Sequence, residues 1–224
     1  MKIVILDVET TGTNPETDTL LEIGGAVIDT ENDVYAPLQF PFRIIIVPTE
    51  DLKGPISLNV LAMHSLNGLW AEIKAANDEM LKDKAATKVV LQNAERGFAV
   101  RPSKVSVILE QMMRPIMNGV STKKACLGGK NVEFDLSFLR KIDDKRIDQY
   151  FIARKFDPAV LWLQENDQRP PSLDECYIRT INMFGPPEES AGQAHNSLND
   201  CRMTAWAIRG GLRRLGLYTP LDYK

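Results

Sequence analysis

The sequence has little of what marks disulfide-rich or membrane-spanning proteins. Its three cysteines, Cys126, Cys176 and Cys201, are an odd number with no Cys-x-x-Cys pair, which argues against a disulfide framework or a structural zinc site. We therefore expect a reducing compartment. No apolar run is long enough to cross a bilayer, and the first one meets Asp7 after a few residues, so we expect no signal peptide. The expected location is cytoplasmic.

Positive charge is also in short supply. The 224 residues carry 27 Lys and Arg against 30 Asp and Glu, a formal charge of −3 with a pI near 5.5. This balance argues against a protein that coats long stretches of duplex with a basic surface. It allows an enzyme that holds a few nucleotides at a strand end. The basic residues between 123 and 146 form either a local rim for such a strand or a solvated helix face.

The order of apolar and polar segments predicts an α/β protein. A chain of 224 residues can bury a substantial core as one domain covering 1–224. Alternating apolar residues predict strands at about 2–8, 20–29 and 34–47, joined as an antiparallel meander. Afterwards we expect a helix from Ser57, a helix from Pro102 that ends near Pro115 and Gly119, a strand at 124–127, a helix from Asn131, a strand at 157–161, and helices capped by Ser172 and Asn196. This order is typical of a mixed sheet covered by helices.

The stretch between residues 70 and 101 has the least readable pattern. It is polar and rich in Ala and Lys, and we expect a helical insertion or elaboration there. Its role stays open between a lid, a partner-binding arm and a surface elaboration.

Two acidic residues interrupt the first strand. Asp7 and Glu9 are two positions apart, so both side chains leave the same face of the strand. Adjacent carboxylates repel each other unless a cation lies between them, and hard oxygen ligands suit Mg²⁺ or Mn²⁺. A solvated edge strand would explain the pair taken alone. The apolar residues before it place it instead at the end of a buried strand, where α/β sheets carry active groups.

Three residues further along the chain add to this pair. Asp135 lies in the first turn of a predicted helix, where the helix dipole also favours an acid without any function. His195 and Asp200 are five residues apart across the start of the last predicted helix. A lone histidine before a helix is usually a surface residue, but the acids favour a catalytic role. An imidazole, with an ordinary pKa of about 6.5, can accept a proton near neutral pH.

Three motifs together resemble the DEDDh exonucleases, also called DnaQ-like. They occur in that family's order: Asp-Val-Glu-Thr-Thr-Gly at 7–12, Asn-Val-Glu-Phe-Asp-Leu-Ser-Phe-Leu at 131–139 and His-Asn-Ser-Leu-Asn-Asp at 195–200. The resemblance implies a ribonuclease H-like fold, with a mixed five-stranded sheet of an antiparallel N-terminal meander and later parallel strands, flanked by helices. It also implies a metal-dependent 3′–5′ exonuclease that cuts DNA or RNA from the 3′ end and releases nucleoside 5′-monophosphates.

The same resemblance implies the roles of the motif residues. The metal-binding acids are Asp7, Glu9, Asp135 and Asp200, and the general base is His195. The implied cofactors are two divalent ions, Mg²⁺ or Mn²⁺. Asp7 would bridge both ions, and Glu9 and Asp200 would complete the site of the nucleophile's metal. Asp135 would serve the second metal. The implied partners are single-stranded 3′ ends of DNA or RNA and a polymerase or other replication or repair protein, with no membrane.

Six further residues are candidates for holding the substrate: Thr10, Thr11, Gly12, His64, Asn131 and Phe138. The first three offer hydroxyls and backbone N–H groups, although an ordinary turn explains Gly12 equally well. His64 lies in a predicted helix that resembles the one placed against the terminal base in the family; a satisfied helix histidine is the alternative. Phe138 is suited to stack on a base, but core packing is the stronger interpretation.

The chain departs from the family beside the middle motif. The family commonly has His-Asn before the aromatic residue and the aspartate, whereas this chain has Lys130 and Asn131. That histidine is not a metal ligand in the family. The departure therefore concerns the loop and its substrate contacts, and it leaves the acids in place.

Two other functions stay open. A non-catalytic binding subunit would keep the fold and hold a partner through the segment 70–101, but the presence of all five motif residues argues against it. An endonuclease of ribonuclease H type needs acids on the same core but not the His-x-x-x-x-Asp ending. Among exonucleases, DNA trimming or proofreading, short-RNA degradation and structured-RNA end processing are equally open, because the acids are common to all three.

Overall fold

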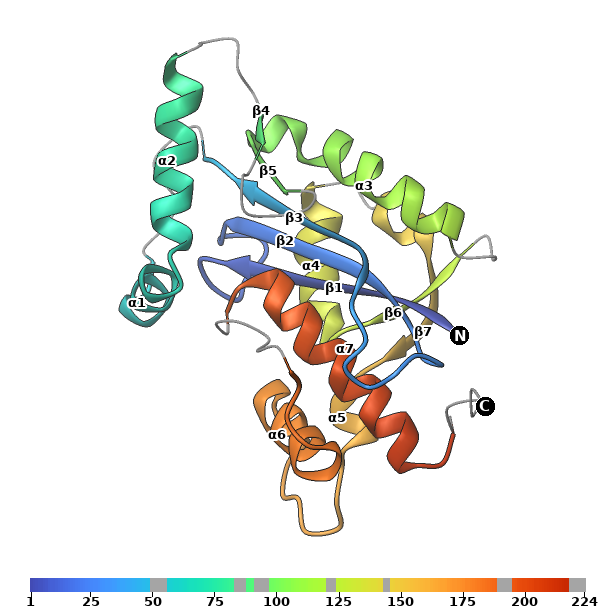
Figure 1. The fold of residues 1–224 in the computed structure, drawn as a ribbon. Coiled ribbons are helices and arrows are strands. Elements are labelled where there is room, and N and C mark those ends of the chain that lie inside the picture. Colours follow the sequence, from blue (N-terminus) through green and yellow to red (C-terminus); the bar gives the residue numbers. More distant parts are fainter. Residues whose placement is uncertain are drawn as a thin grey trace.

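The computed structural model describes residues 1–48, 56–82, 88–90, 97–119, 124–142, 146–188 and 195–217 (Figure 1). Its strands are β1 (Lys2–Thr10), β2 (Leu20–Asp29), β3 (Gln39–Ile46), β4 (Lys88–Val90), β5 (Gly97–Val100), β6 (Ala125–Gly128) and β7 (Phe151–Phe156). Its α-helices are α1 (Leu58–Leu66), α2 (Leu69–Lys82), α3 (Val105–Gly119), α4 (Val132–Ile142), α5 (Pro158–Leu161), α6 (Leu173–Phe184) and α7 (Ser197–Arg214). Short 3₁₀ turns, Pro102–Lys104 and Arg146–Tyr150, precede α3 and β7.

Within these residues one sheet of seven strands runs in the order β4-β5-β3-β2-β1-β6-β7. β1, β2 and β3 are antiparallel neighbours, β6 is parallel to β1, and β7 is parallel to β6. The predicted α/β class, with an antiparallel meander followed by parallel strands, is confirmed. The predicted number of five strands is wrong, because β4 and β5 extend the sheet beyond β3. These strands have three and four residues, too few for a clear alternation of apolar side chains.

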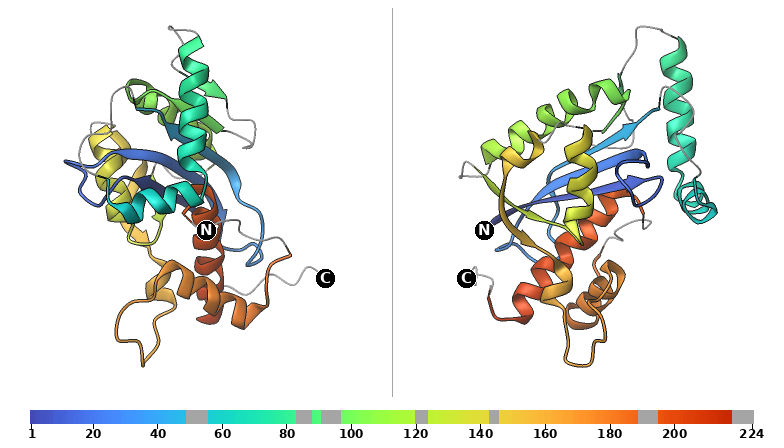
Figure 2. Two further views of the ribbon diagram at one scale, coloured as in Figure 1. Left: turned by 90° about the vertical axis from the view of Figure 1, so that its left-hand side faces the viewer. Right: turned by 180° about the vertical axis from the view of Figure 1, so that it is seen from behind.

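Helices cover both faces of the sheet (Figures 1 and 2). The alternation of side chains in β1 explains how. Val4, Leu6 and Val8 pack on one face, in the core shared with α3 and α4. Ile3 and Ile5 pack on the other face, against α7. α2 packs against β3 through the apolar face of the helix.

The order of elements between β6 and α6 differs from the prediction. The predicted strand at 157–161 is wrong, because Asp157 caps the short helix α5 by accepting a 2.8 Å hydrogen bond from the N–H of Ala159. Pro158 occupies the first turn, where its missing N–H costs nothing. The strand beside β6 is β7. It is mostly exposed and contains Arg154 and Lys155, so an apolar alternation does not mark it.

The predicted caps of the last two long helices are confirmed. Ser172 and Glu175 form a reciprocal capping box at the start of α6, with hydrogen bonds of 2.6 and 3.2 Å. The side chain of Asn196 accepts a hydrogen bond from the N–H of Asn199 and starts α7. His195 therefore directly precedes the cap of α7.

The segment 70–101 is part helix and part strand. α2 supplies its helical half, β4 and β5 lie in the other half, and residues 83–87 and 91–96 lie outside the described part of the chain. The predicted helical elaboration thus accounts only for α2. Over the described ranges no helix has the length and apolar composition that a membrane span requires.

Candidate active site

The carboxyl-terminal end of β1 carries the acids of the first motif. Asp7 and Glu9 lie opposite Gly24 and Glu22 of β2 in the antiparallel register. A Cβ on Gly24 would overlap the backbone and side chain of Ser197. Glycine at this position therefore lets the first turn of α7 approach the sheet beside Asp7.

Glu9, His195 and Asp200 come together at this strand end. One carboxylate oxygen from each acid and one ring nitrogen of the histidine all lie within 4.8 Å of one another. Glu9 is buried, Asp200 is half-buried in the first turn of α7, and His195 is exposed. The backbone of His195 also donates a hydrogen bond to the carboxylate of Asp200. The third motif thus lies beside the first.

Asp135 reaches the same strand end from the first turn of α4. Its side chain is buried, and its Oδ1 accepts a 2.9 Å hydrogen bond from the backbone N–H of Val8. Its charge raises the pKa of both Asp7 and Glu9. The structure therefore brings the residues of all three motifs to one end of β1.

Burial and mutual repulsion raise the pKa of every member of the acidic cluster, which we define as Asp7, Glu9, Asp135 and Asp200. Burial raises the pKa of Glu9 to about 9, and Glu22 adds the largest repulsion. Burial also raises the pKa values of Asp135 and Asp200 to about 7, although a backbone hydrogen bond to each opposes the rise. The pKa of Asp7 lies well above its ordinary value, through burial first and then Asp135. Ionisation of all four carboxylates near neutral pH therefore requires a compensating cation.

The acidic cluster fits divalent metal ions. Its donors are carboxylate oxygens, which Mg²⁺ and Mn²⁺ prefer, and they raise one another's pKa. Arg43 is the positive group that lowers the pKa of Glu9, but its guanidinium already forms ion pairs with Glu22 and Glu72. Neutralisation of the cluster therefore falls to bound cations or to protons.

His64 is buried beside the acidic cluster. Its side chain has no exposed surface, and its Nε2 lies 3.0 Å from the carbonyl oxygen of Thr10. Because a carbonyl only accepts, Nε2 must carry the proton, and Nδ1, which lies 4.0 Å from Oε2 of Glu9, is the bare nitrogen of a neutral ring. Burial lowers the pKa of His64, in agreement with that neutral form. His64 is thus a satisfied helix histidine that joins α1 to β1, and its contact with a terminal base stays a prediction.

The hydroxyls of Thr10 and Thr11 serve the turn after β1. Thr10 Oγ1 donates to the carbonyl of Gly12 at 2.6 Å, and Thr11 Oγ1 accepts from the N–H of Thr19 at 2.8 Å. A Cβ on Gly12 would overlap the carboxylate of Asp18, which would have to shift to make room for it. These contacts give all three residues a role in the turn. Their contact with a substrate stays a prediction.

The middle motif contains one buried and one exposed substrate candidate. Phe138 is 2% exposed and packs in the core, with its ring centroid 5.2 Å from that of Phe134. Phe138 therefore packs in the core, as its stronger interpretation has it, and its contact with a base stays untested. Asn131 is exposed, with a φ of 55°, and its N–H donates to the carboxylate of Asp157. Lys130 lies 3.9 Å from the same carboxylate. Asn131 stays a candidate for contact with the substrate.

Glu22 is a site neighbour that the motifs do not reveal. It is fully buried and accepts hydrogen bonds from the N–H and hydroxyl of Ser197, at 2.9 and 2.5 Å, and from Arg43 at 2.6 Å. Arg43 also forms two hydrogen bonds with Glu72 of α2. A single acid inside the apolar run Leu-Leu-Glu-Ile was the available signal.

Asn67 is a second such neighbour, in the turn between α1 and α2. Its Nδ2 donates to the carbonyl oxygen of His195 and lies 3.4 Å from Nδ1 of His64. Its Oδ1 accepts a 3.0 Å hydrogen bond from the N–H of Leu69. The sequence holds no signal for this contact, because asparagine is common at helix ends for local reasons.

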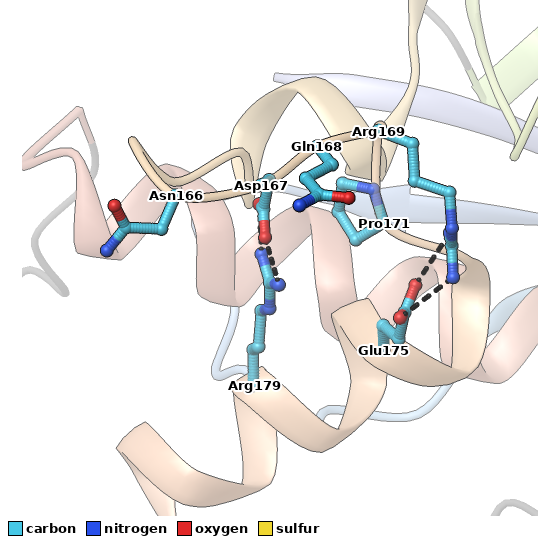
Figure 3. A pocket seen from close by; sticks show the side chains of 7 residues that line it. All are labelled: Asn166, Asp167, Gln168, Arg169, Pro171, Glu175 and Arg179. Carbon is cyan, nitrogen blue, oxygen red and sulfur yellow. Dashed lines mark hydrogen bonds and ion pairs between the residues drawn. The ribbon is translucent and has the colours of Figure 1, made fainter.

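A surface cavity of about 430 Å³ lies between α6 and the loop before it, and no member of the acidic cluster lines it (Figure 3). Two ion pairs cross it: Arg179 with Asp167 at 2.6 Å and Arg169 with Glu175 at 3.0 Å. Each guanidinium drawn there already has an acidic partner. The cavity is therefore a poor match for a phosphate chain.

Comparison with known sequences gives one partial match to a nuclease. No model of a protein family matches the chain. A segment of 71 residues is 37% identical to the oligoribonuclease of Tropheryma whipplei (strain Twist). This segment makes up 32% of this chain and 37% of that protein. The similarity thus spans about a third of each protein.

Solved structures with a similar fold cover nearly the whole chain. Exonuclease I from Methylocaldum szegediense has a TM-score of 0.56 at 17% identity, over 96% of this chain and 41% of that one. E. coli exonuclease I in complex with a dA16 oligonucleotide has a TM-score of 0.57 at 15% identity, over 96% and 41%. S. pombe Pop2p in its Mg²⁺- and Mn²⁺-bound form has a TM-score of 0.62 at 12% identity, over 98% and 86%.

These likenesses establish the fold. The chain has the ribonuclease H-like fold of exonucleases, and the resemblance to the DEDDh exonucleases that the motifs indicate is confirmed at that level. The chain spans 41% of the exonuclease I chains, and its match spans 37% of the oligoribonuclease.

Proposed function

We propose that the protein is a metal-dependent 3′–5′ exonuclease that acts on single-stranded nucleic acid and releases nucleoside 5′-monophosphates. One observation carries the proposal: Glu9, His195 and Asp200, from β1 and the start of α7, place their ligand atoms within 4.8 Å of one another. A carboxylate cluster with an imidazole beside it is suited to phosphodiester hydrolysis. The exonuclease fold and the partial similarity to an oligoribonuclease support the same reaction.

The acidic cluster would hold two divalent ions. In this proposal Asp7 would contribute to both sites, Glu9 and Asp200 would contribute to one, and Asp135 would contribute to the other. Mg²⁺ or Mn²⁺ bound there supplies positive charge for the attacking and leaving oxygens of an in-line displacement. The same fold in S. pombe Pop2p is known in a form bound to these two metals, which supports the choice.

His195 is the proposed general base. Its ring lies beside Glu9 and Asp200, two of the proposed metal ligands, which suits it to accept a proton from a water molecule held there. The imidazole accepts a proton from that water as the oxygen bonds to phosphorus. The bond from phosphorus to the 3′-oxygen of the preceding nucleotide breaks, and that oxygen takes up a proton from solvent. One nucleoside 5′-monophosphate leaves, and the strand ends in a new 3′-hydroxyl.

The proposed substrate class is the free 3′ end of single-stranded DNA or RNA. The acids and His195 act on the phosphodiester, which both polymers share. E. coli exonuclease I is known with a bound oligodeoxynucleotide, and the partial sequence relative is an oligoribonuclease. These neighbours support both polymers as test substrates.

A ladder assay tests the proposal. Single-stranded DNA, RNA and short oligoribonucleotides, each labelled at the 5′ end, are incubated with the protein and Mg²⁺, Mn²⁺ or EDTA. We expect 5′-labelled products that shorten by one nucleotide at a time with either metal and no shortening in EDTA. The product mixture should contain nucleoside 5′-monophosphates.

The matched control is Asp200→Ala, purified in parallel to reveal contaminating nucleases. Shortening by the wild-type protein that exceeds this control on at least one polymer supports the proposal. Equal traces for the two proteins on all three polymers would overturn it and favour a non-catalytic binding subunit.

A further inference from the structure

His195 has a backbone conformation that needs support from its surroundings. Its φ of 60° lies in the left-handed region, which residues other than glycine rarely adopt. Such a conformation persists where neighbouring contacts fix it, and it is often found at active sites. The contacts that fix the backbone at His195 therefore also determine where its imidazole lies.

The first of these contacts comes from Asn67. Its Nδ2 donates to the carbonyl oxygen of His195, while its Oδ1 is held by the N–H of Leu69 at the start of α2. The backbone N–H of Asn67 is in turn bonded to the carbonyl of Met63 in α1, at 3.0 Å. The amide is fixed on both sides, so its donor side faces His195 and its acceptor side faces α2.

The second contact comes from Glu22. One carboxylate oxygen accepts both the N–H and the hydroxyl of Ser197, two residues after His195. The other oxygen accepts from Arg43, which Glu72 of α2 holds through two further hydrogen bonds. Glu22 is fully buried and has three charge-assisted hydrogen bonds, so it fixes the start of α7 firmly.

We propose that Asn67 and Glu22 are positioning residues for His195, so that the helix pair α1–α2 sets the place of the imidazole over the acidic cluster. The contact of Asn67 starts in the turn between α1 and α2, whereas that of Glu22 starts in β2 and is linked to α2 through Arg43 and Glu72. The two contacts end on either side of the cap of α7. This inference rests on the proposed exonuclease function, because it assigns roles within the same site. Neither residue takes part in the chemical step; both act through His195.

The lead variants are Asn67→Asp and Asn67→Ala. Asp keeps the oxygen that caps α2 and loses the donor to His195, and Ala loses the donor without adding charge. We expect each variant to lower kcat by about 10- to 100-fold, the cost of a small displacement of a reacting group, with KM changed less than about threefold. Asp78→Asn, which alters an exposed ion pair on α2, is the matched control and should leave kcat unchanged.

The same substitutions in a His195→Ala background separate positioning from general stability. A residue that acts only through the imidazole costs nothing further once the imidazole is gone. We therefore expect Asn67→Asp to lower kcat in the wild type and to have no effect in His195→Ala. Equal losses in the two backgrounds, or no loss in either, would overturn the inference.

Histidine NMR gives a readout that does not depend on activity. The chain has two histidines, so in tag-free protein the His195→Ala spectrum assigns both imidazole signals. Glu22→Gln keeps the shape of the side chain and removes its charge, and it should broaden or shift the signal of His195 in a protein that still melts cooperatively. An unchanged His195 signal in both Glu22→Gln and Asn67→Asp would overturn the inference. A wild-type protein without hydrolytic activity would overturn the proposed function instead, and the NMR result would still decide the positioning.

Discussion

The backbone N–H of Val8 donates a 2.9 Å hydrogen bond to the carboxylate of Asp135, 127 residues away in the chain. Val8 lies between the two acids of β1, and Asp135 lies in the first turn of α4. The bond therefore fixes one acid of the cluster relative to two others. It also lowers the pKa of Asp135 and so opposes the effect of burial.

Asp135→Asn and Asp135→Ala should separate the structural and chemical roles of this carboxylate. Both remove the charge, and Asn keeps an oxygen that can accept from Val8. We expect both variants to lose nearly all hydrolysis. Only Ala leaves the buried N–H of Val8 without a partner, so its free energy of unfolding should be lower than that of Asn by about 1–3 kcal/mol. Urea unfolding and the ladder assay check the two statements, and substantial activity in Asp135→Asn would remove the residue from the metal site.

Asp7→Ala and Asp200→Ala test the acidic cluster as a metal site. Each should abolish nearly all hydrolysis and weaken Mn²⁺ binding in isothermal titration, because each removes a proposed ligand. In EDTA each should raise the melting temperature above that of the wild type, because one repelling charge is gone. Retention of more than about a tenth of wild-type activity in both variants would contradict the two-metal assignment.

The pH dependence of stability should differ between the metal-free and metal-bound protein. Folding raises the pKa of Glu9 from 4.5 to about 9 and those of Asp135 and Asp200 from 3.8 to about 7. Over this window the folded protein binds more protons than the unfolded chain, so its stability falls as pH rises. We expect the melting temperature in EDTA to decrease from about pH 5 to about pH 9, and saturating Mg²⁺ to reduce that decrease.

Glu9→Gln is the matched control for this dependence, because it removes the group with the highest of the three pKa values. The metal-free variant should lose less stability than the wild type between about pH 7 and 9. A wild-type melting temperature in EDTA that rises over the same pH range would contradict the prediction. It would mean that repulsion among the carboxylates of the acidic cluster does not destabilise the folded protein.

Much of the fold follows from local patterns. Strand β2 occupies the predicted residues 20–29, and Ser172 and Asn196 cap the helices that they are predicted to cap. These features depend on alternation and on hydrogen bonds a few residues apart, which the sequence states directly. The motif residues were likewise identifiable, because each motif is short.

The contacts that hold the site depend on distant parts of the chain. Asn67 and His195 are 128 residues apart, and Glu22 and Ser197 are 175 apart. No local sequence pattern predicts these long-range contacts. They form only when β1 and β2 pair in the observed register and α1 and α7 take their places beside the sheet. The same reason applies to Phe138. Its position in the motif fits a side chain that stacks on a base as well as one that packs in the core, and only the packing of α4 assigns it to the core.

His195→Ala tests the general base. The rate should fall by about 10²- to 10⁴-fold, the usual contribution of such a group, while Mn²⁺ affinity stays close to that of the wild type. In the wild type the rate should fall as pH drops, because a protonated imidazole cannot accept a proton. An unchanged rate and pH profile in the variant would remove His195 from the mechanism.

A strand with a 3′-phosphate should be degraded much more slowly than the same strand with a 3′-hydroxyl. The added phosphate carries up to about two negative charges to the end of β1, where Asp7 and Glu9 already repel each other. The two strands, both labelled at the 5′ end, are compared in the ladder assay at saturating Mg²⁺. Treatment of the phosphorylated strand with a phosphatase should restore the rate of its twin, which controls for differences in sequence and purity.

A closed circular single strand extends this test to the polarity of the reaction. It has the same phosphodiesters as a linear strand but no terminus, so a protein that must hold a 3′ end has nothing to bind. We expect the circle to persist under conditions that degrade the linear strand completely, as judged by gel mobility. Linearisation of the circle at a rate similar to that of linear degradation would mean internal cutting. The acidic cluster would then belong to an endonuclease, and the exonuclease proposal would have to be given up even if every metal ligand were correct.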